Sequence, residues 1–485
     1  MILIITEFNI NQILLDEKKI LIILFLLPCC IVTVLSQNKK PNIVLILADD
    51  LGYGDVGFNG QKLIKTPNLD RLANDGITLK QFYAGTAVCA PSRSSLMTGK
   101  HTGHTFIRGN LGVEPEGQYP IPDTIVTLAE VLKKSGYKTG AYGKWGLGPV
   151  GSQGDPNRQG FDHFFGYNCQ SLAHRYYPEH LWNDQEKVIL KENGKLESLK
   201  EYAPDLTQQQ ALAFIDKNKE EPFFLFLPYI LPHAELIVPN DSIFRYYKGK
   251  FDEKPFKGFD YGTNAKPTGY VSQQYPHATF AAMVARLDLY VVQVINKLKE
   301  LGLEENTLII FTSDNGPHKE GGADPDFFNS AAGLRGIKRD LYEGGIRVPF
   351  VAKWPKVIKA GQSSDFVGTF WDIMPTLSEI TGSKSPEHID GISFTNALMG
   401  NKNQNTHEYL YWEFHEGGGK QAVRYGNWKG IRLNVIKDKN AVIALYDLSS
   451  DPQEKHDIAL KHPDIVKKIA LFMNEAHTES QVFPW

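Results

Sequence analysis

The sequence predicts an α/β protein in which a mostly parallel sheet lies between two layers of helices, followed by a small antiparallel sheet with a helix. Short apolar runs such as 42–48 and 222–228 are typical of strands that are buried on both faces. Helical patterns alternate with these runs over most of the chain, which favours parallel strands joined by helices. After 390–394 the runs become shorter and richer in aromatic residues, which indicates antiparallel strands.

The elements of the large sheet follow in chain order. A helix is expected at 66–74, because Thr66 suits the N-cap position and Pro67 suits the first helical position. A second helix at 123–134 is expected to be capped by Asp123 or Thr124. Further strands are expected at 77–83, 137–142, 306–312 and 346–352, and further helices at 206–217 and 276–301.

The C-terminal sheet is expected from aromatic-rich runs that are separated by turns. These runs lie at 409–414, 421–425, 428–433 and 441–447, and a helix at 465–475 closes the sheet. Together with the apolar segment near the N-terminus, this change in the length and composition of the apolar runs predicts three parts. They are a signal segment at 1–37, a large α/β domain at 38–390 and an α+β subdomain at 391–485.

The apolar segment 21–35 is the expected signal for export to the periplasm or the extracellular space. It follows a pair of lysines and precedes a polar run, as a secretory signal does. It is shorter than the roughly 20 residues of a membrane helix, so no stable membrane insertion is expected. Residues 1–17 are interpreted as an upstream extension. A lipoprotein anchored at Cys29 or Cys30 is the weaker alternative, since the apolar run continues past both.

Charge and composition exclude several classes of protein. The 52 Lys and Arg residues against 55 Asp and Glu residues give a net charge of −3 without a basic run, so no nucleic-acid partner is expected. A hydrophobic content of 42% with a mean hydropathy of −0.29 excludes a polytopic membrane protein and a disordered chain. Two of the four cysteines lie in the signal segment, and Cys89 and Cys169 alone make no disulfide scaffold.

Oxygen-bearing side chains follow two predicted strands directly. Asp49 and Asp50 follow the strand at 42–48, and Asp314 and Asn315 follow the strand at 306–312. The ends of such strands meet at one edge of the sheet, where α/β proteins usually place their active sites. Carboxylate and amide oxygens suit Ca²⁺ or Mg²⁺ and do not suit Zn²⁺. Taken separately, each pair also fits an ordinary turn.

A cysteine lies close to the start of a predicted helix in the run CAPSRSSLMTG at 89–99. Pro91 suits the first turn of a helix, so Cys89 is expected near a helix N-terminus, which favours an anion. Arg93, one turn further on, is expected to face the same point. These residues are consistent with a low-pKa thiolate nucleophile, and equally with a small buried cysteine in a loop.

Five motifs carry a resemblance to a known family. The run at 89–99 resembles the Cys-x-Pro-x-Arg signature of the formylglycine-dependent sulfatases. NIVLILADDLGYGD, GYKTGAYGKWGLG, FTSDNG and GIKRDLYEGGIRVP accompany it in the order that the family has. The resemblance covers about residues 40–460 and identifies the chain as a type I sulfatase of the alkaline phosphatase-like superfamily, most similar to bacterial polysaccharide sulfatases. It implies that fold for the catalytic domain, and it implies sulfuric ester hydrolysis.

The resemblance implies a nucleophile that is made after synthesis. A separate maturation enzyme would oxidise Cys89 to formylglycine, whose aldehyde is hydrated to a gem-diol. One hydroxyl would attack sulfur and displace the alcohol, and the other would then let the adduct expel sulfate and regenerate the aldehyde.

The resemblance also assigns the residues around that nucleophile. One Ca²⁺ would be bound by Asp49, Asp50, Asp314 and Asn315 and would polarise the sulfate. Arg93 would brace the diol, and Lys144 and Lys338 would bind sulfate oxygens. His233 would act as the general acid that protonates the departing alcohol.

One motif departs from the family. Many members have Lys-Trp-His-Leu-Gly, where the histidine deprotonates the sulfated diol, whereas this chain has Gly146 in that place. The elimination therefore uses another base or needs no dedicated histidine. The candidates are His318, His104 and a metal-linked carboxylate.

The expected substrate is a sulfated saccharide, with galactose or N-acetylgalactosamine 4-sulfate preferred. His174 and Arg175 lie in the aromatic segment 171–182, and His415 and Glu416 follow a strand of the C-terminal subdomain. Such side chains beside aromatic rings can bind sugar hydroxyls and stack on sugar rings.

Two alternatives remain open from the sequence. The first is a phosphate or phosphonate ester hydrolase of the same superfamily, although a single set of hard-cation ligands favours sulfate. The second is a catalytically silent protein that binds sulfated glycans, since activity depends on a modification that the sequence does not guarantee.

Overall fold

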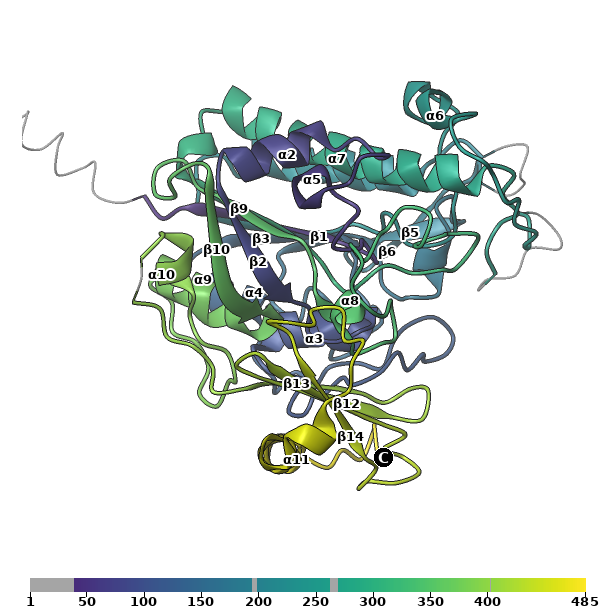
Figure 1. Cartoon of the computed structure of the whole chain (residues 1–485). Helices are drawn as coiled ribbons and strands as arrows, with labels where there is room; N and C mark the ends of the chain where they lie inside the picture. The colour runs from purple at the N-terminus through teal and green to yellow at the C-terminus, as the bar shows by residue number, and fades with distance from the viewer. Residues whose placement is uncertain (1–38, 194–198, 262–268, 402) are drawn as a thin grey trace, which may run out of the picture. The chain divides into compact units, whose positions relative to one another are not determined.

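The computed structural model describes residues 39–193, 199–261, 269–401 and 403–485. The predicted signal at 21–35, with its extension at 1–17, lies outside the described residues. The described part contains one large sheet and one small sheet, with helices on both faces of the large one (Figure 1). This arrangement confirms the predicted fold class.

The large sheet has ten strands and is mixed. Its strands, in spatial order, are β10 (Gln362–Thr369), β2 (Ile77–Tyr83), β9 (Phe350–Lys353), β8 (Thr307–Ser313), β1 (Asn42–Ala48), β7 (Phe223–Pro228), β3 (Lys138–Lys144), β4 (His163–Tyr167), β5 (His180–Asn183) and β6 (Glu186–Ile189). The central run from β8 to β4 is parallel. β9 is antiparallel to both neighbours, and β5 and β6 form an antiparallel edge. The carboxyl ends of β8, β1, β7 and β3 therefore meet at one edge.

Two hydrophobic cores flank this sheet, because alternate residues of each central strand point to opposite faces. Val44 and Ile46 of β1 belong to the core beneath α2 (Pro67–Asn74), α5 (Ala203–Lys217) and α7 (Pro276–Glu300). Ile43, Leu45 and Leu47 belong to the opposite core. The helices on that side are α3 (Cys89–Thr98), α4 (Leu128–Lys134), α9 (Ile373–Thr381) and α10 (Thr395–Leu398) (Figure 1).

α7 is the one helix in the described ranges whose length and composition would suit a membrane span. Most of its apolar window, 78%, is buried inside the molecule, where it packs against α2, α5 and α6 (Ser242–Tyr247). Its apolar character is therefore accounted for by the core.

The small sheet is antiparallel and links the C-terminal part to the large sheet. Its strands are β11 (Leu410–Phe414), β12 (Lys420–Tyr425), β13 (Trp428–Leu433) and β14 (Ile443–Asp447), and α11 (Pro463–Ala476) covers one face. On the other face the Trp412 ring lies 5.4 Å from that of Tyr83 and 5.7 Å from that of Trp371. Trp412 Nε1 also donates to the carbonyl of Ala84.

Two predicted boundaries are wrong for identifiable reasons. α4 begins at Leu128 and is capped by Thr127, not by Asp123 or Thr124. Thr127 Oγ1 accepts from the Glu130 N–H while the Glu130 carboxylate accepts from the Thr127 N–H, which is a complete capping box. The strand expected at 346–352 begins only at Phe350, because the preceding residues form the short helix α8 (Glu343–Ile346).

The buried carboxyl of Asp55, in the loop after β1, is expected to make the stability of the fold depend on pH. Burial raises the pKa of this carboxyl to about 7. The unfolded chain releases the proton near its ordinary pKa, so stability falls as the pH rises from about 4 to about 7. We expect Asp55→Asn to stabilise the fold by on the order of 2–4 kcal/mol at pH 8 and to change little at pH 4. Thermal midpoints at both values check this, and equal shifts at the two would contradict it.

Candidate active site

The four predicted metal-site residues lie together at the carboxyl ends of β1 and β8. Asn315 Nδ2 donates to Asp50 Oδ1 at 2.7 Å, and the Asp50 backbone N–H donates to Asp314 Oδ1 at 3.1 Å. Asp49 reaches the same cluster through Arg93, which it shares with Asp314. All four side chains are buried, so the expectation that two parallel strand ends converge here is met.

Asp50 adopts a backbone conformation that is costly for an aspartate. Its φ is 61°, in the left-handed region that residues with a Cβ seldom occupy. Strain of this kind persists where the surrounding structure overdetermines it, commonly at functional sites. Here the turn directs the carboxylates of Asp49 and Asp50 into one cluster.

Cys89 is the first residue of α3, two residues earlier than the start expected at Pro91. Its Sγ lies 3.4 Å from Asp49 Oδ1 and is buried. Burial, and then the charge of Asp49, raise the pKa of this thiol well above its usual value. Burial and the charge of Asp49 therefore argue against a low-pKa thiolate at the unmodified residue, although it lies at a helix N-terminus.

Arg93 and Lys144 hold the carboxylates on one side of Cys89. Arg93 donates to Asp314 Oδ2 through Nε at 3.0 Å and through Nη2 at 2.8 Å. It also contacts Asp49 Oδ2 at 3.2 Å and donates to the backbone carbonyl of Lys144 at 2.6 Å. Lys144 Nζ, at the end of β3, lies 2.6 Å from Asp49 Oδ2.

Lys338 occupies the other side of the cluster. Its Nζ lies 2.7 Å from Asp50 Oδ2, 3.0 Å from His233 Nε2 and 3.1 Å from Glu320 Oε2. Lys338, Lys144 and Arg93 thus place three buried cations against the three carboxylates of Asp49, Asp50 and Asp314. Buried charges are tolerated when paired in this way.

The charges shift the pKa values of the two shared carboxylates in opposite directions. Burial raises the pKa of Asp49, but Lys144, Arg93 and Lys338 outweigh it and hold the pKa below its usual value. Burial and the charge of Asp49 raise the pKa of Asp314 despite Arg93. Because the three carboxylates repel one another, the cluster is suited to an additional cation.

His233 accepts a hydrogen bond from Lys338, which fixes its proton position. Its Nδ1 faces the carbonyl of Ala234, so the ring proton sits on Nδ1 and Nε2 accepts from Lys338. Burial, followed by Lys338 and Lys144, lowers the pKa of His233 well below its usual value, so the ring is neutral. The proton available at this place is therefore the one shared between Lys338 and His233.

Glu320 belongs to the site and was not foreseen from the sequence. Its carboxylate lies 3.1 Å from Lys338 Nζ and 2.5 Å from Arg339 Nη1. Its position six residues after Asp314, in the same glycine-rich segment, places it close to the strand end along the chain but does not give the direction of its side chain.

The residues present fit a hard cation. Single ligand atoms of Asp49, Asp50, Cys89 and His233 all lie within 4.8 Å of one another. The thiol is protonated and His233 Nε2 accepts from Lys338, which leaves carboxylate oxygens as the donors. Asn315 Oδ1 is buried without a hydrogen-bond partner in the described ranges, as an oxygen reserved for a ligand would be. Such an oxygen set suits Ca²⁺ or Mg²⁺.

The predicted substrate residues divide into two places. The His174 ring stacks on that of His233 with centroids 5.0 Å apart, so His174 lies at the site. Arg175 is already engaged by other side chains, with Nη1 2.7 Å from Glu235 Oε2 and its guanidinium over the ring of Tyr261.

His415 and Glu416 lie at the junction with the small sheet. His415 Nε2 lies 2.8 Å from Glu413 Oε1, within a buried group that also holds Arg108 and His477. Glu416 Oε1 accepts from the N–H of Asn110, whose Oδ1 accepts from the N–H of Ala90 beside Cys89. Asn110 thereby connects Glu416, at the end of the small sheet, by hydrogen bonds to the residue next to Cys89.

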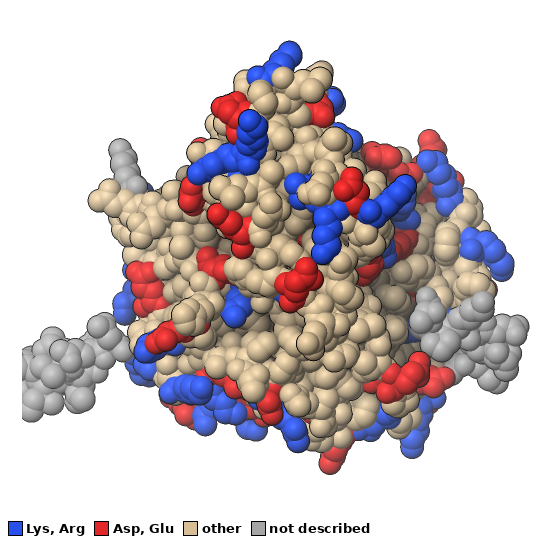
Figure 2. Space-filling view, turned by 90° about the horizontal axis from the view of Figure 1, so that it is seen from below, with Lys and Arg blue, Asp and Glu red and all other residues tan. Residues whose placement is uncertain are grey.

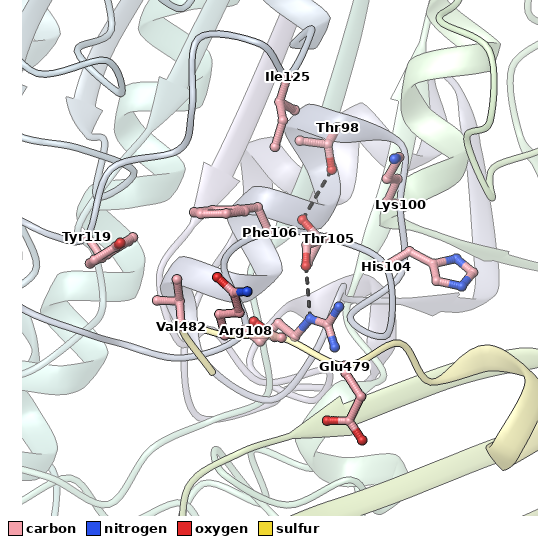
Figure 3. Close-up of a pocket in the computed structure, with 12 residues that line it drawn as sticks. Thr98, Lys100, His104, Thr105, Phe106, Arg108, Tyr119, Ile125, Glu479 and Val482 are labelled. Atoms are coloured by element: carbon pink, nitrogen blue, oxygen red, sulfur yellow. Dashed lines mark hydrogen bonds between the residues drawn. The ribbon is translucent and has the colours of Figure 1, made fainter. Parts of the chain in front are cut away.

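His104 is not placed to act as the elimination base. It pairs with Asp390 at 2.8 Å near the C-terminal end of α3, which lies nine residues and about 14 Å along the helix from Cys89. It lines a separate cavity of about 460 Å³ that contains none of the other predicted site residues (Figure 3). The neighbouring His101 accepts from the Gly103 N–H through Nδ1, so its Nε2 carries the proton and cannot bind a metal ion with Asp390.

His318 is close to the site but both its ring nitrogens are occupied. Nδ1 accepts from the Glu320 N–H at 3.1 Å, which leaves the proton on Nε2, 3.1 Å from the carbonyl of Pro232. Of the three candidate bases, the carboxylate remains, and Asp49 Oδ1 is the carboxylate oxygen that contacts Cys89.

The surface carries no single-sign patch on the face seen from below. Acidic and basic side chains are interspersed over it (Figure 2). This mixed pattern agrees with the small net charge of −3.

Fold and site together are those of a hydrolase of anionic esters with α/β architecture: a buried cysteine lies among buried cations, beside a group of oxygen-bearing side chains that suits a hard cation. Residues 41–383 match the sulfatase family, and residues 337–479 match the C-terminal region of N-sulphoglucosamine sulphohydrolase. The chain belongs to the sulfatase family and is a sulfuric ester hydrolase of alkaline phosphatase-like fold, as predicted.

This chain is similar to known sulfatases along most of its own length and of theirs. An N-acetylgalactosamine-6-O-sulfatase of Bacteroides thetaiotaomicron is 29% identical over 91% of this chain and 94% of that protein. Human steryl-sulfatase is 30% identical over 92% of this chain and 89% of that protein. The crystal structure of Ps i-CgsB in complex with k-i-k-neocarrahexaose superimposes with a TM-score of 0.75 at 29% identity, over 90% of this chain and 92% of that one.

Proposed function

We propose that this protein is an exported sulfatase that releases inorganic sulfate from a sulfated saccharide, with formylglycine at position 89 and one bound Ca²⁺. The observation that carries the proposal is the position of Cys89. Its Sγ contacts Asp49 inside a ring of three buried cations, which is an environment built for an anionic ester.

The environment of Cys89 argues for modification. A buried thiol whose pKa is raised is a poor nucleophile, since the thiolate is the reactive form. As formylglycine, the residue would supply a hydrated aldehyde whose hydroxyl attacks sulfur. Asp49 Oδ1, 3.4 Å from the sulfur atom, is the group of this chain placed to accept a proton there. The partner required is a maturation enzyme that oxidises the cysteine.

Asp49, Asp50, Asp314 and Asn315 would hold the Ca²⁺. When bound, the ion would polarise the sulfate and favour the negative charge that develops on it. Arg93 keeps Asp49 and Asp314 in place, and Lys144 and Lys338 supply donors to the sulfate oxygens.

The pair of Lys338 and His233 would protonate the departing alcohol. We expect His233→Gln to lower kcat on a sulfated sugar by about 100-fold. Hydrolysis of 4-nitrophenyl sulfate should fall less than about tenfold, because nitrophenolate leaves without a proton. Equal losses on both substrates, measured as sulfate released, would contradict this role.

The saccharide is proposed to be galactose or N-acetylgalactosamine sulfate. The relatives described above include a protein named for N-acetylgalactosamine 6-sulfate and a structure that holds a neocarrahexaose. Their names support a galactose-type sugar. They do not decide whether the sulfate group is at position 4, as we expect, or at position 6. Initial rates on the 4- and 6-sulfates of both sugars make that comparison. Export is proposed from the segment 21–35 alone, and the N-terminal sequence of the protein from its host tests it.

The test of the proposed function is the mass of the tryptic peptide 81–93 from the protein isolated from its own host. Formylglycine makes this peptide roughly 18 Da lighter than the cysteine form. We expect the lighter peptide together with sulfate release from a sulfated sugar. An unmodified cysteine, with tight glycan binding and no release, would instead establish a silent binding protein.

A further inference from the structure

The segment 168–174, after β4, lies against both sides of the site. At one end the Gly146 N–H donates to the carbonyl of Asn168, two residues beyond Lys144. At the other end the ring of His174 stacks on that of His233, which accepts from Lys338. The middle of the segment therefore spans the distance between the two lysines.

Gln170 lies in the middle of this segment with an unused amide. The residue is 6% exposed, and neither Nε2 nor Oε1 has a hydrogen-bond partner within the part of the chain that the structure describes. Its backbone is fixed, since its N–H donates to Gln118 Oε1 at 2.7 Å. Burying an amide with both ends unpaired is costly, and native structures seldom do so without a purpose.

Gly146 leaves room for this amide. Its φ is 78°, and a Cβ at this position would lie 2.2 Å from Gln170 Nε2. Any larger residue at 146 would push the amide away. The strand end that carries Lys144 into the site thus also accommodates the amide of Gln170.

Other atoms of the same segment are also unpaired. Asn168 Oδ1 and His174 Nδ1 are buried without partners among the described residues. A single buried polar atom without a hydrogen-bond partner would be a local defect. Here three residues of one seven-residue segment, beside the buried lysines of a sulfatase site, have buried polar atoms without partners among the described residues, which points to a polar ligand.

We propose that Gln170 contacts the substrate, with its amide NH₂ donating to a sulfate oxygen and its carbonyl accepting from a sugar hydroxyl beside the sulfate. A sulfate group offers acceptors only, so it satisfies one end of the amide. The other end needs a donor, which a neighbouring hydroxyl supplies. This inference rests on the proposed function and deepens it. It names one side-chain amide that would bind both the sulfate group and the neighbouring hydroxyl of the sugar.

Gln170→Met tests the contact, because methionine has a similar volume and no hydrogen-bonding groups. We expect kcat/KM on the sulfated sugar to fall by about 10- to 100-fold. The thermal midpoint without ligand should stay equal or rise, since no bond is lost and a buried polar group is removed. Gln170→Glu should lose more activity than Gln170→Met, because a carboxylate would face the anionic sulfate.

Gln159→Met is the matched control. Gln159 is buried too and its Oε1 also has no partner among the described residues, but its Nε2 donates to the carbonyl of Gln153 at 2.9 Å. This variant should lose stability and keep kcat/KM within about twofold. A lower midpoint for Gln170→Met, or a kcat/KM within twofold of the unaltered protein, would overturn the inference.

Inorganic sulfate separates this inference from the proposed function. We expect sulfate to raise the thermal midpoint of the unaltered protein, and to raise that of Gln170→Met much less. If the unaltered protein hydrolyses no sulfate ester but this difference persists, the proposed function fails and the contact stands. If hydrolysis is normal and both proteins respond equally to sulfate, the contact fails and the function stands.

Discussion

Cys89→Ala is expected to lower the rate of sulfate release by at least about a thousandfold, the largest effect of any single substitution in this protein. The reason lies in the environment of the residue. Asp49, Lys144 and Arg93 contribute charge around position 89, but none of them can form the hydrated aldehyde whose hydroxyl would attack sulfur and whose collapse would release sulfate. Ion chromatography of released sulfate measures the loss.

Cys169→Ser is the control for that prediction. Cys169 is the other free, buried cysteine of the described residues, and its sulfur accepts from the Leu172 N–H, a bond that serine can keep. Its activity should stay close to that of the unaltered protein. If Cys89→Ala retained a tenth of the original rate, the covalent role of position 89 would be excluded.

The parts of the site that could be predicted are those whose positions depend on strand ends. Asp49, Asp50, Asp314 and Asn315 each follow an apolar run directly, and parallel strands of one sheet end at one edge. Local pattern and sheet geometry are sufficient for this inference. The family resemblance then supplied Cys89, Arg93, Lys144, His233 and Lys338, all of which the structure places within one cluster.

The parts that could not be predicted depend on loops and on strand direction. Glu320 and Gln170 owe their positions to how loops return over the sheet edge, and no periodicity in the sequence encodes that. β9 has four residues and is antiparallel to both neighbours, while an apolar run looks the same in either direction. α4 begins later than predicted because the capping box of Thr127 and Glu130 sets its start, whereas the earlier polar residues Asp123 and Thr124 do not cap it.

Charge balance explains why the site tolerates its own burial. Three cations and three carboxylates are paired at distances between 2.6 and 3.2 Å. An incoming Ca²⁺ brings two positive charges and a sulfate ester brings one negative charge, so the two ligands would offset each other in part. Removal of one partner leaves a buried charge uncompensated, which costs more than the pair contributes.

Asp314→Ala is therefore expected to impair metal binding, catalysis and stability together. The variant loses one of four proposed ligands, and Arg93 loses the acceptor of two hydrogen bonds. We expect Ca²⁺ affinity to fall at least about tenfold, since affinity follows the number of charged ligands. Sulfate release should fall at least about 100-fold, and the free energy of unfolding should fall by about 3 kcal/mol, because Arg93 stays buried with one carboxylate partner, Asp49, in place of two. Calorimetric Ca²⁺ titration and thermal unfolding measure these effects.

Two further variants separate the ligand role of Asp314 from its structural role. Asp314→Asn keeps the volume and an acceptor for Arg93 but removes the charge, so it should fold and still bind Ca²⁺ weakly. Asp55→Asn removes a buried carboxylate from the loop after β1 that has no place in the proposed ligand set, so its Ca²⁺ affinity should be unchanged. Unaltered Ca²⁺ affinity in Asp314→Asn would exclude this carboxylate as a ligand and would leave its contact with Arg93 as its role.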